Sequence, residues 1–276
     1  MIKVATIAGS DASGGAGLEA DLKTFSEYGL YGMAAVTVIA TMDPDNGWAH
    51  GVYALPEEVI DAQLKTVFKG VGPIACKTGM LGTEYAVELT RKYISEYKLD
   101  HFVLDPVMVC KGANQPLSPE LNTAIAQKLL PLAEIATPNL FEASQLAGMG
   151  EITTLKQMEE ACKIIAGKGA RHVFLKGGSK LAQSDSSIEK GRAVDLYYDG
   201  QRFEQIESSL IDTTWTHGAG CTTAAAITSG LARGLKAYEA IVLAKKFISE
   251  SLSHGFPLNQ WVGPGNPSAW RKGFGV

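Results

Sequence analysis

This sequence contains little cysteine and only a small excess of charge. Its 276 residues include four scattered cysteines with no Cys-x-x-Cys pair, which argues against a zinc site and against a disulfide scaffold. The net charge of −4 argues against a nucleic acid or a membrane surface as the main partner. No apolar run reaches membrane-spanning length, and Lys3 and Asp11 interrupt the N-terminal apolar stretch, so no signal peptide is predicted. We expect a soluble, cytoplasmic protein with reduced thiols.

Apolar runs alternate with amphipathic stretches, and hydrophobic residues make up 46% of the chain. Predicted strands cover residues 2–8, 33–39, 74–77, 101–104, 135–136, 171–175, 194–198 and 201–206. Predicted helices cover residues 18–28, 56–68, 84–97, 118–129, 154–166, 221–231 and 238–254. Asp199-Gly200 predicts a two-residue hairpin turn, and the polar segment 180–191 predicts a mobile loop. The alternation predicts one α/β domain over residues 1–276, with a mostly parallel sheet between two helical layers.

Polar and glycine-rich segments follow the ends of several predicted strands. In a mostly parallel sheet, the carboxyl ends of the strands share one edge, where ligands bind. We therefore expect one site that is lined by segments far apart in the sequence. These segments are Gly9-Ser10-Asp11, Met42-Asp43, Gly79-Met80, Asp105-Pro106, Asn139 and Lys176-Gly177-Gly178.

The segment His217-Gly218-Ala219-Gly220-Cys221 opens a predicted helix of small residues. Backbone N–H groups at such a helix start point outward, and the helix dipole favours an anion there. The same field is expected to lower the pKa of the Cys221 thiol and make it a usable base or nucleophile. One short segment could therefore hold a developing phosphate charge and also accept a proton.

Two acidic residues near neighbouring strand ends suit a magnesium site. Asp105 directly follows one strand, and Glu142 lies three residues after Asn139 in the segment that follows the next strand. Ordinary helix capping would also explain Asn139 and Glu142. Carboxylates beside phosphates bind Mg²⁺ through water, and two acidic groups at neighbouring strand ends favour the metal interpretation.

Two further segments carry weaker signals for phosphate binding. The segment 9–17 is rich in glycine but fits neither the Walker pattern nor the dinucleotide fingerprint. A tight turn would explain its glycines, and so would a close approach of the backbone to a flat ligand. Lys176, followed by Gly177 and Gly178, places a cation and two open amides at another strand end, which suits phosphate.

Taken together, these segments resemble the ribokinase-like superfamily in its vitamin-kinase branch, around hydroxymethylpyrimidine (phosphate) kinase. The resemblance extends from Thr6 to the final helices. Its motifs are Thr6-Ile7-Ala8-Gly9-Ser10-Asp11, Gly14-Gly15-Ala16-Gly17, Ala20-Asp21-Leu22-Lys23-Thr24, Lys77-Thr78-Gly79-Met80-Leu81, Asp105-Pro106-Val107-Met108, Thr137-Pro138-Asn139 and Lys176-Gly177-Gly178. It implies a three-layer α/β/α ribokinase-like fold, with ATP as co-substrate and Mg²⁺. It leaves a monovalent cation open, and a homodimer is expected because relatives are commonly dimers.

Two departures from the pyrimidine kinases favour a different substrate. Those enzymes usually carry Ala-Gln-Asn after the second strand, where the glutamine contacts the aminopyrimidine, but here Met42 stands at that place and cannot make the hydrogen bond. In addition, Cys110 lies in the segment that covers the substrate, and its pairing with Cys221 resembles two-cysteine pyridoxal kinases. A thiolate adds reversibly to an aldehyde, so Cys110 could tether pyridoxal but not pyridoxine.

The resemblance implies residue roles in ATP-dependent phosphorylation of the 5′-hydroxyl group of pyridoxal. Cys221 would take the proton, and Cys110 would move with a lid over residues 108–115. The anion hole would be formed by Gly218, Ala219, Gly220 and Cys221. The metal-binding residues would be Asp105 and Glu142, and the ATP-binding residues Asn139, Lys176, Gly177, Gly178 and Thr213. The substrate-binding residues would be Gly9, Asp11, Ala16, Met42, His50, Met80 and Val107.

Three other functions stay open at this point. The nearest is a hydroxymethylpyrimidine (phosphate) kinase of thiamin biosynthesis, or a bifunctional enzyme. The second is an acyl-transfer enzyme with Cys221 as nucleophile and His217 as base. The third is a non-catalytic protein that binds a vitamer without consuming ATP. The set of Asp105, Glu142, Lys176 and Cys221 favours catalysis, so we predict a pyridoxal kinase of vitamin B6 salvage.

Overall fold

A computed structural model describes residues 1–108 and 119–271 and contains one nine-stranded sheet with the order β3-β2-β1-β4-β5-β6-β7-β8-β9. The strands are β1 (Lys3–Asp11), β2 (Tyr31–Asp43), β3 (Ala49–Ala54), β4 (Ala75–Thr78), β5 (His101–Leu104), β6 (Ile135–Ala136), β7 (His172–Gly177), β8 (Arg192–Tyr198) and β9 (Phe203–Ser209). The pairs from β2 through β1, β4, β5 and β6 to β7 are parallel. Antiparallel pairs occur at both edges, where β3 joins β2 and where β8 and β9 follow β7. The predicted mostly parallel sheet is confirmed.

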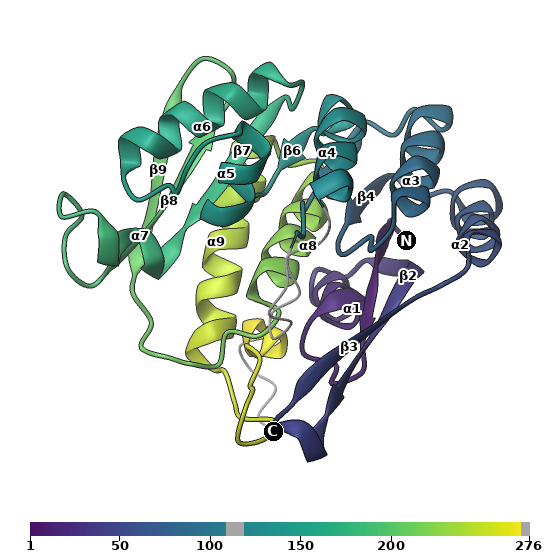
Figure 1. The fold of residues 1–276 in the computed structure, drawn as a ribbon, viewed down its shortest axis with the longest axis horizontal. Helices are drawn as coiled ribbons and strands as arrows, with labels where there is room; N and C mark the ends of the chain where they lie inside the picture. The colour runs from purple at the N-terminus through teal and green to yellow at the C-terminus, as the bar shows by residue number, and fades with distance from the viewer. Residues whose placement is uncertain (109–118, 272–276) are drawn as a thin grey trace.

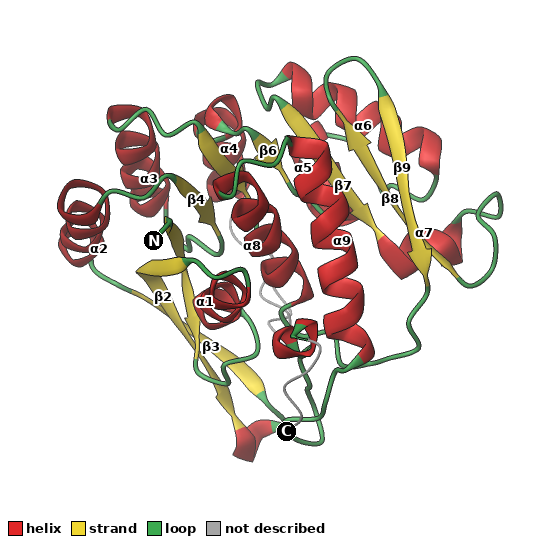
Figure 2. Ribbon diagram, turned by 180° about the vertical axis from the view of Figure 1, so that it is seen from behind, coloured by secondary structure: helices red, strands yellow, loops and turns green. Residues whose placement is uncertain are grey.

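Helices cover both faces of this sheet. They are α1 (Gly17–Glu27), α2 (Glu57–Leu64), α3 (Glu84–Glu96), α4 (Pro119–Lys128), α5 (Leu140–Ala147), α6 (Leu155–Gly167), α7 (Gly178–Ser184), α8 (Ala219–Ala232) and α9 (Ala237–Ser253). Shorter helical segments are η1 (Pro44–Asn46), η2 (Lys65–Val71), η3 (Leu130–Leu132) and η4 (Pro267–Trp270). Helices α2 to α6 pack on one face (Figure 1), and α1, α8 and α9 pack on the other (Figure 2). The three predicted layers are therefore present.

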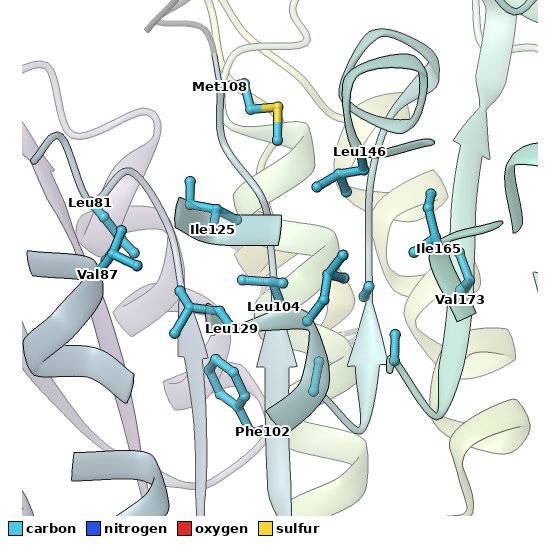
Figure 3. Close-up of a cluster of buried hydrophobic side chains, with 14 of the residues drawn as sticks. Leu81, Val87, Phe102, Leu104, Met108, Ile125, Leu129, Leu146, Ile165 and Val173 are labelled. Atoms are coloured by element: carbon cyan, nitrogen blue, oxygen red, sulfur yellow. The ribbon is translucent and has the colours of Figure 1, made fainter. Parts of the chain in front are cut away.

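Strand β5 shows how the two hydrophobic cores share the sheet. Phe102 and Leu104 pack in the core under α2 to α6 (Figure 3), whereas Val103 packs in the core under α1, α8 and α9. Successive side chains of a strand point to opposite faces, so a sheet covered on both faces needs continuously apolar strands. The strand ends at buried Leu104 and places Asp105 at the carboxyl edge of the sheet.

Two elements at the edges of the sheet differ from the sequence prediction. The sequence does not predict β3, because most of this edge strand is exposed and it lacks the buried apolar pattern of the inner strands. Together β2, η1 and β3 form an arm that extends past the neighbouring strands (Figure 1). Helix α7 occupies the start of the segment 180–191 that is predicted as a loop, and Leu181 is buried there.

The hairpin between β8 and β9 is present, but its predicted two-residue turn is wrong. Tyr198 pairs with Phe203, so four residues, 199–202, form the connection. The Asp199 carboxylate accepts the backbone N–H groups of Gln201 and Arg202 at 2.8 and 2.7 Å. This local capping by aspartate stabilises the longer turn.

None of the helices in the described part of the chain has the length and apolar character needed to cross a membrane.

Candidate active site

A pocket of about 430 Å³ lies at the carboxyl edge of the parallel strands and collects most of the predicted site residues. The predicted residues on its wall are Gly9, Asp11, Ala16, Met42, His50, Met80, Asp105, Val107, Asn139, Glu142, Lys176, Gly178, Gly218, Ala219, Gly220 and Cys221. Among the described residues, Gly177 and Thr213 are predicted for the site but are not part of the wall. Cys110 and lid residues 109–115 lie outside the described residues.

The two exceptions have different surroundings. Gly177 lies behind the wall, where an added Cβ would stand 2.5 Å from the Val194 carbonyl oxygen. The hydroxyl group of Thr213 accepts the backbone N–H of Trp215 at 3.1 Å, a bond within its own loop. Their predicted contact with ATP therefore has no support from the pocket geometry.

The glycine-rich segment 9–17 packs directly against the start of α8. Gly218 precedes this helix with φ +74°, a conformation that favours glycine. A Cβ at Gly218 would stand 2.0 Å from the Gly15 carbonyl oxygen, so no larger residue fits without moving the loop. The loop therefore closely approaches the chain's own predicted anion hole, and its approach to a flat ligand stays a prediction.

Cys221 is the third residue of α8 and lines the pocket, and the residue as a whole is partly buried. The predicted lowering of its pKa is wrong. Burial raises the pKa to about 11, and the charges of Asp21 and Asp105 also raise it. Lys77 and a hydrogen bond from the Gly17 N–H act in the opposite direction but do not outweigh the burial. Desolvation, which the sequence pattern does not reveal, therefore exceeds the effect of the helix start.

Asp11 joins the glycine-rich segment to His217, which directly precedes the predicted anion hole. Its carboxylate accepts the backbone N–H groups of Ser13 and Ala16, both at 2.8 Å, and lies 2.6 Å from Nε2 of His217. Burial alone would raise the Asp11 pKa, but the bonds to His217 and Ser13 lower it to about 2. The Asp11 carboxylate thus already has hydrogen-bond partners within the protein, and its predicted contact with substrate stays a prediction.

Asp105, Glu142 and Lys176 form a charged cluster on the pocket wall. Asp105 Oδ1 lies 3.3 Å from the Lys176 ammonium group, and Glu142 accepts the Asn139 N–H at 2.8 Å. Asn139 Oδ1 accepts the Glu142 N–H at 2.9 Å, so the capping interpretation of these two residues is confirmed. Burial raises the Glu142 pKa to about 7, and Asp105 adds to this shift while Lys176 opposes it.

The donor set of this cluster suits a metal held mainly by water and phosphate. Within the described ranges, no group of three or more His, Cys, Asp or Glu side chains is placed to hold a metal ion. Mg²⁺ typically keeps several waters and uses only one or two carboxylates beside phosphates. Asp105 and Glu142, both buried and both on the pocket wall, fit that pattern.

Two charged pairs near the site are not among the predicted site residues. At one end of the pocket, Asp195 of β8 accepts the Lys245 ammonium group at 2.6 Å and the Gly178 N–H at 3.0 Å. In the interior of the protein, Lys77 of β4 pairs with Asp21 of α1. The available signal for Asp195 is that it is the single charged residue within the otherwise apolar stretch 193–198 of β8.

The geometry combines the parts needed to move a phosphoryl group onto an alcohol. The predicted anion hole and Cys221 line the same pocket as Met42, His50 and Met80, which suit a ring, and as Lys176, which suits phosphate. An added Cβ at Gly220 would stand 3.5 Å from the Lys176 ammonium group, so the cation lies beside the anion hole. Nε2 of His217, the residue that acyl transfer would need as base, lies 2.6 Å from the Asp11 carboxylate.

Comparisons with known proteins agree with this geometry. The family described as phosphomethylpyrimidine kinase matches residues 11–266. A curated pyridoxine kinase of Bacillus subtilis is 52% identical over 271 residues, which cover 98% of this chain and 97% of the relative. The hydroxymethylpyrimidine/phosphomethylpyrimidine kinase of the same organism is 36% identical, over 99% of this chain and 97% of the relative.

Solved structures show the same relationship. An ADP complex of Bacillus subtilis pyridoxal kinase has a TM-score of 0.92 and 51% identity, and the match covers 99% of both chains. The pyridoxal kinase of Staphylococcus aureus in complex with AMP-PCP and pyridoxal has a TM-score of 0.90 and 43% identity, covering 99% of this chain and 96% of that one. At these identities, the likeness extends beyond the fold to the family.

Proposed function

The chain belongs to the phosphomethylpyrimidine kinase family, and on that basis we propose that it transfers the γ-phosphoryl group of ATP to the 5′-hydroxyl group of pyridoxal, in vitamin B6 salvage. The observation that carries this choice is the contrast between the two Bacillus subtilis relatives, of which the pyridoxine kinase is much more similar than the pyrimidine kinase. Met42 on the pocket wall supports the same choice, because its thioether offers no strong hydrogen bond to an aminopyrimidine.

In the proposed reaction, the Cys221 thiolate accepts the proton of the 5′-hydroxyl group while the hydroxyl oxygen bonds to the γ-phosphorus. The bond from that phosphorus to the bridging oxygen breaks, and ADP leaves with the electron pair. The amides of Gly218 to Cys221 would stabilise charge on the transferring group, and Lys176 would contact the phosphates. Asp105 and Glu142 would hold Mg²⁺, which supplies positive charge to the phosphates when it is bound.

A side-by-side kinase assay tests the function. Purified protein is incubated with ATP and Mg²⁺ and with pyridoxal, pyridoxine or hydroxymethylpyrimidine, and both ADP and the phosphorylated product are measured. We expect the largest kcat/KM for pyridoxal. A larger kcat/KM for the pyrimidine would instead support thiamin biosynthesis, and similar values for both would support the bifunctional enzyme, which the 36% identical relative keeps as the second candidate.

The tether at Cys110 is a proposal from the sequence. Addition of its thiolate to the pyridoxal aldehyde would fix the 5′-hydroxyl group for transfer, and pyridoxine has no aldehyde to react. We expect Cys110→Ala to lower kcat/KM for pyridoxal by about 100-fold and for pyridoxine by less than about threefold. Equal losses on the two substrates would remove the tether. The homodimer, a monovalent cation, the single kinase domain and the cytoplasmic location also stay predictions.

A further inference from the structure

Asp195 of β8 and Lys245 of α9 form an ion pair on the pocket wall. The Lys245 ammonium group lies 2.6 Å from Asp195 Oδ2, and the Gly178 N–H donates to Asp195 Oδ1 at 3.0 Å. The two side chains are only 12% and 7% exposed. Charged side chains are rarely buried unless they are paired, and a buried pair contributes little to stability compared with apolar packing. Its place on a pocket wall therefore points to a ligand.

The order of the strands places this pair at the far side of the pocket from the residues that suit a ring. Met42 and His50 come from β2 and β3, near one edge of the sheet. Asp105 follows β5, Lys176 lies on β7 and Asp195 lies on β8, toward the other edge. The predicted anion hole opens α8, which packs on β4 and β5 between these two groups. A nucleotide whose γ-phosphate faces the ring would therefore extend toward β8.

The ion pair lies next to the cation that suits phosphate. Leu175 of β7 pairs with Leu196 of β8, and the next residues toward the pocket are Lys176 and Asp195. Gly178, whose N–H bonds to Asp195, follows Lys176 by two residues. In ATP, the ribose is joined directly to the phosphates. With the phosphates at Lys176 and the predicted anion hole, the ribose is therefore the group that reaches the pair.

The pocket wall near the pair also has an apolar part. Ile248 and Leu252 line the pocket and follow Lys245 on α9 by three and seven residues, so all three share one face of the helix. Phe174 of β7 lines the same pocket. Helix α9 covers the face of the sheet that α8 also covers (Figure 2). An apolar wall suits a flat purine base, which leaves the charged pair to the hydroxyl groups.

We propose that Asp195 and Lys245 bind the ribose hydroxyl groups of the nucleotide and so make the protein select ribonucleotides over deoxyribonucleotides. The inference rests on the proposed function, in which ATP is the phosphate donor. A carboxylate has about four acceptor sites, and Gly178 and Lys245 use only part of them. The ammonium group has further N–H donors besides the one that Asp195 accepts. Acidic side chains hold ribose hydroxyl groups in dinucleotide-binding folds by the same chemistry.

Isothermal titration calorimetry tests the proposal without the vitamin substrate. The full-length protein is titrated with ADP, 2′-deoxyADP and 3′-deoxyADP, all in the presence of Mg²⁺. We expect at least one deoxynucleotide to bind about tenfold or more weakly than ADP, because a hydrogen bond to a charged group contributes more than one between neutral groups. Affinities for all three nucleotides that agree within about twofold would overturn the proposal.

Asp195→Asn and Lys245→Gln show whether the pair itself reads the ribose. Both variants remove a charge and keep a polar side chain of similar size. In each variant, we expect weaker binding of ADP and a ratio of deoxyADP to ADP dissociation constants that falls to within about threefold. Lys246→Gln is the matched control, because Lys246 is the exposed neighbour of Lys245 and does not line the pocket. Its dissociation constants should stay within about twofold of the wild-type values.

A purely structural pair gives a different result. Its loss would weaken the binding of all three nucleotides by the same factor and leave the ratio at the wild-type value, and that outcome rejects the proposal. Inosine diphosphate, which differs from ADP in the base alone, checks the other end of the nucleoside. A variant that changes only the preference for ADP over inosine diphosphate would assign the pair to the base and also reject it. If Asp195→Asn does not fold, Lys245→Gln is judged by the same ratio. If neither folds, the wild-type affinities decide.

The kinase assay keeps this inference separate from the proposed function. If ADP binds with the expected preference but pyridoxal is not phosphorylated, the proposed substrate fails and the role of the pair stands. If pyridoxal is phosphorylated but the protein binds ADP and both deoxynucleotides equally, only the role of Asp195 and Lys245 fails. Absence of ADP binding would reject both.

Discussion

The sulfur of Cys221 experiences two opposing physical effects. The start of α8 and the Gly17 N–H favour the thiolate, whereas burial and two carboxylates favour the thiol. The balance places the pKa at about 11, so at neutral pH most of the protein carries a thiol there. If Cys221 is the base, as we propose, the proton must go to this minor thiolate form.

The pH dependence of Cys221 alkylation follows from this pKa. The thiolate population should rise about tenfold per pH unit between pH 7 and pH 9, with no plateau, because the pKa of about 11 lies above this range. The measurement is the rate of iodoacetamide modification of the Cys221 peptide in the wild type. A plateau below pH 8 would show that the sulfur has a lowered pKa, as the helix start alone predicts.

Asp11 should make stability depend on acidity. Its pKa falls from 3.8 to about 2 on folding, and a carboxyl group with a lowered pKa stabilises the fold above its unfolded pKa. We expect Asp11→Asn to lower the free energy of unfolding by about 2 kcal/mol at pH 7. The difference from the wild type should shrink as the pH falls from about 4 to about 2, where the wild type loses the same contribution. Urea unfolding at several pH values measures it, and a pH-independent difference would contradict the account.

At the scale of elements, the arm formed by β2, η1 and β3 shapes the ring end of the pocket. Met42 of β2 pairs with His50 of β3 in the antiparallel register, and both line the pocket. Burial lowers the His50 pKa, and the charge of His217 lowers it further, so His50 favours its neutral form. The arm therefore offers a thioether and an imidazole at the place where the ring is expected to bind.

Replacing Met42 tests how the arm selects the substrate. Glutamine can donate and accept hydrogen bonds, and one such bond contributes about 1 kcal/mol. We expect Met42→Gln to raise the ratio of kcat/KM for hydroxymethylpyrimidine over pyridoxal about fivefold. Met42→Leu is the matched control, because it keeps the apolar surface and should leave the ratio within about twofold. An equal ratio in both variants would remove Met42 from substrate selection.

The sequence predicts elements best where a strand is buried on both faces. The apolar run 101–104 predicts β5, and the rule for parallel sheets then places Asp105 at the site. Strand β3 escapes prediction because it is an exposed edge strand, although it brings His50 to the pocket. Buried charged residues whose partners are distant in the sequence, such as Lys77 and Asp195, leave no local periodic signal. The same reason explains the wrong sign predicted for the Cys221 pKa.

At the scale of the whole molecule, two hydrophobic cores pack on the two faces of the sheet whose carboxyl edge carries the site. Phe102 is fully buried in the core under α2 to α6 (Figure 3). We expect Phe102→Ala to lower the free energy of unfolding by about 3–5 kcal/mol, because it leaves a cavity. Tyr53→Ala is the control, since Tyr53 is 62% exposed and its removal should cost less than about 0.5 kcal/mol. Urea unfolding compares them, and similar losses would contradict the assignment of the core.

The central claim is that Cys221 receives the proton when the phosphoryl group moves from ATP to the vitamin. The most direct test is kcat for pyridoxal phosphorylation by Cys221→Ala, with ADP affinity measured on the same preparation. The account predicts that kcat falls by at least about 100-fold, because a general base contributes about 100-fold to 10,000-fold. The ADP dissociation constant should stay within about twofold of the wild-type value. A variant that keeps a kcat within about threefold of the wild type would contradict it.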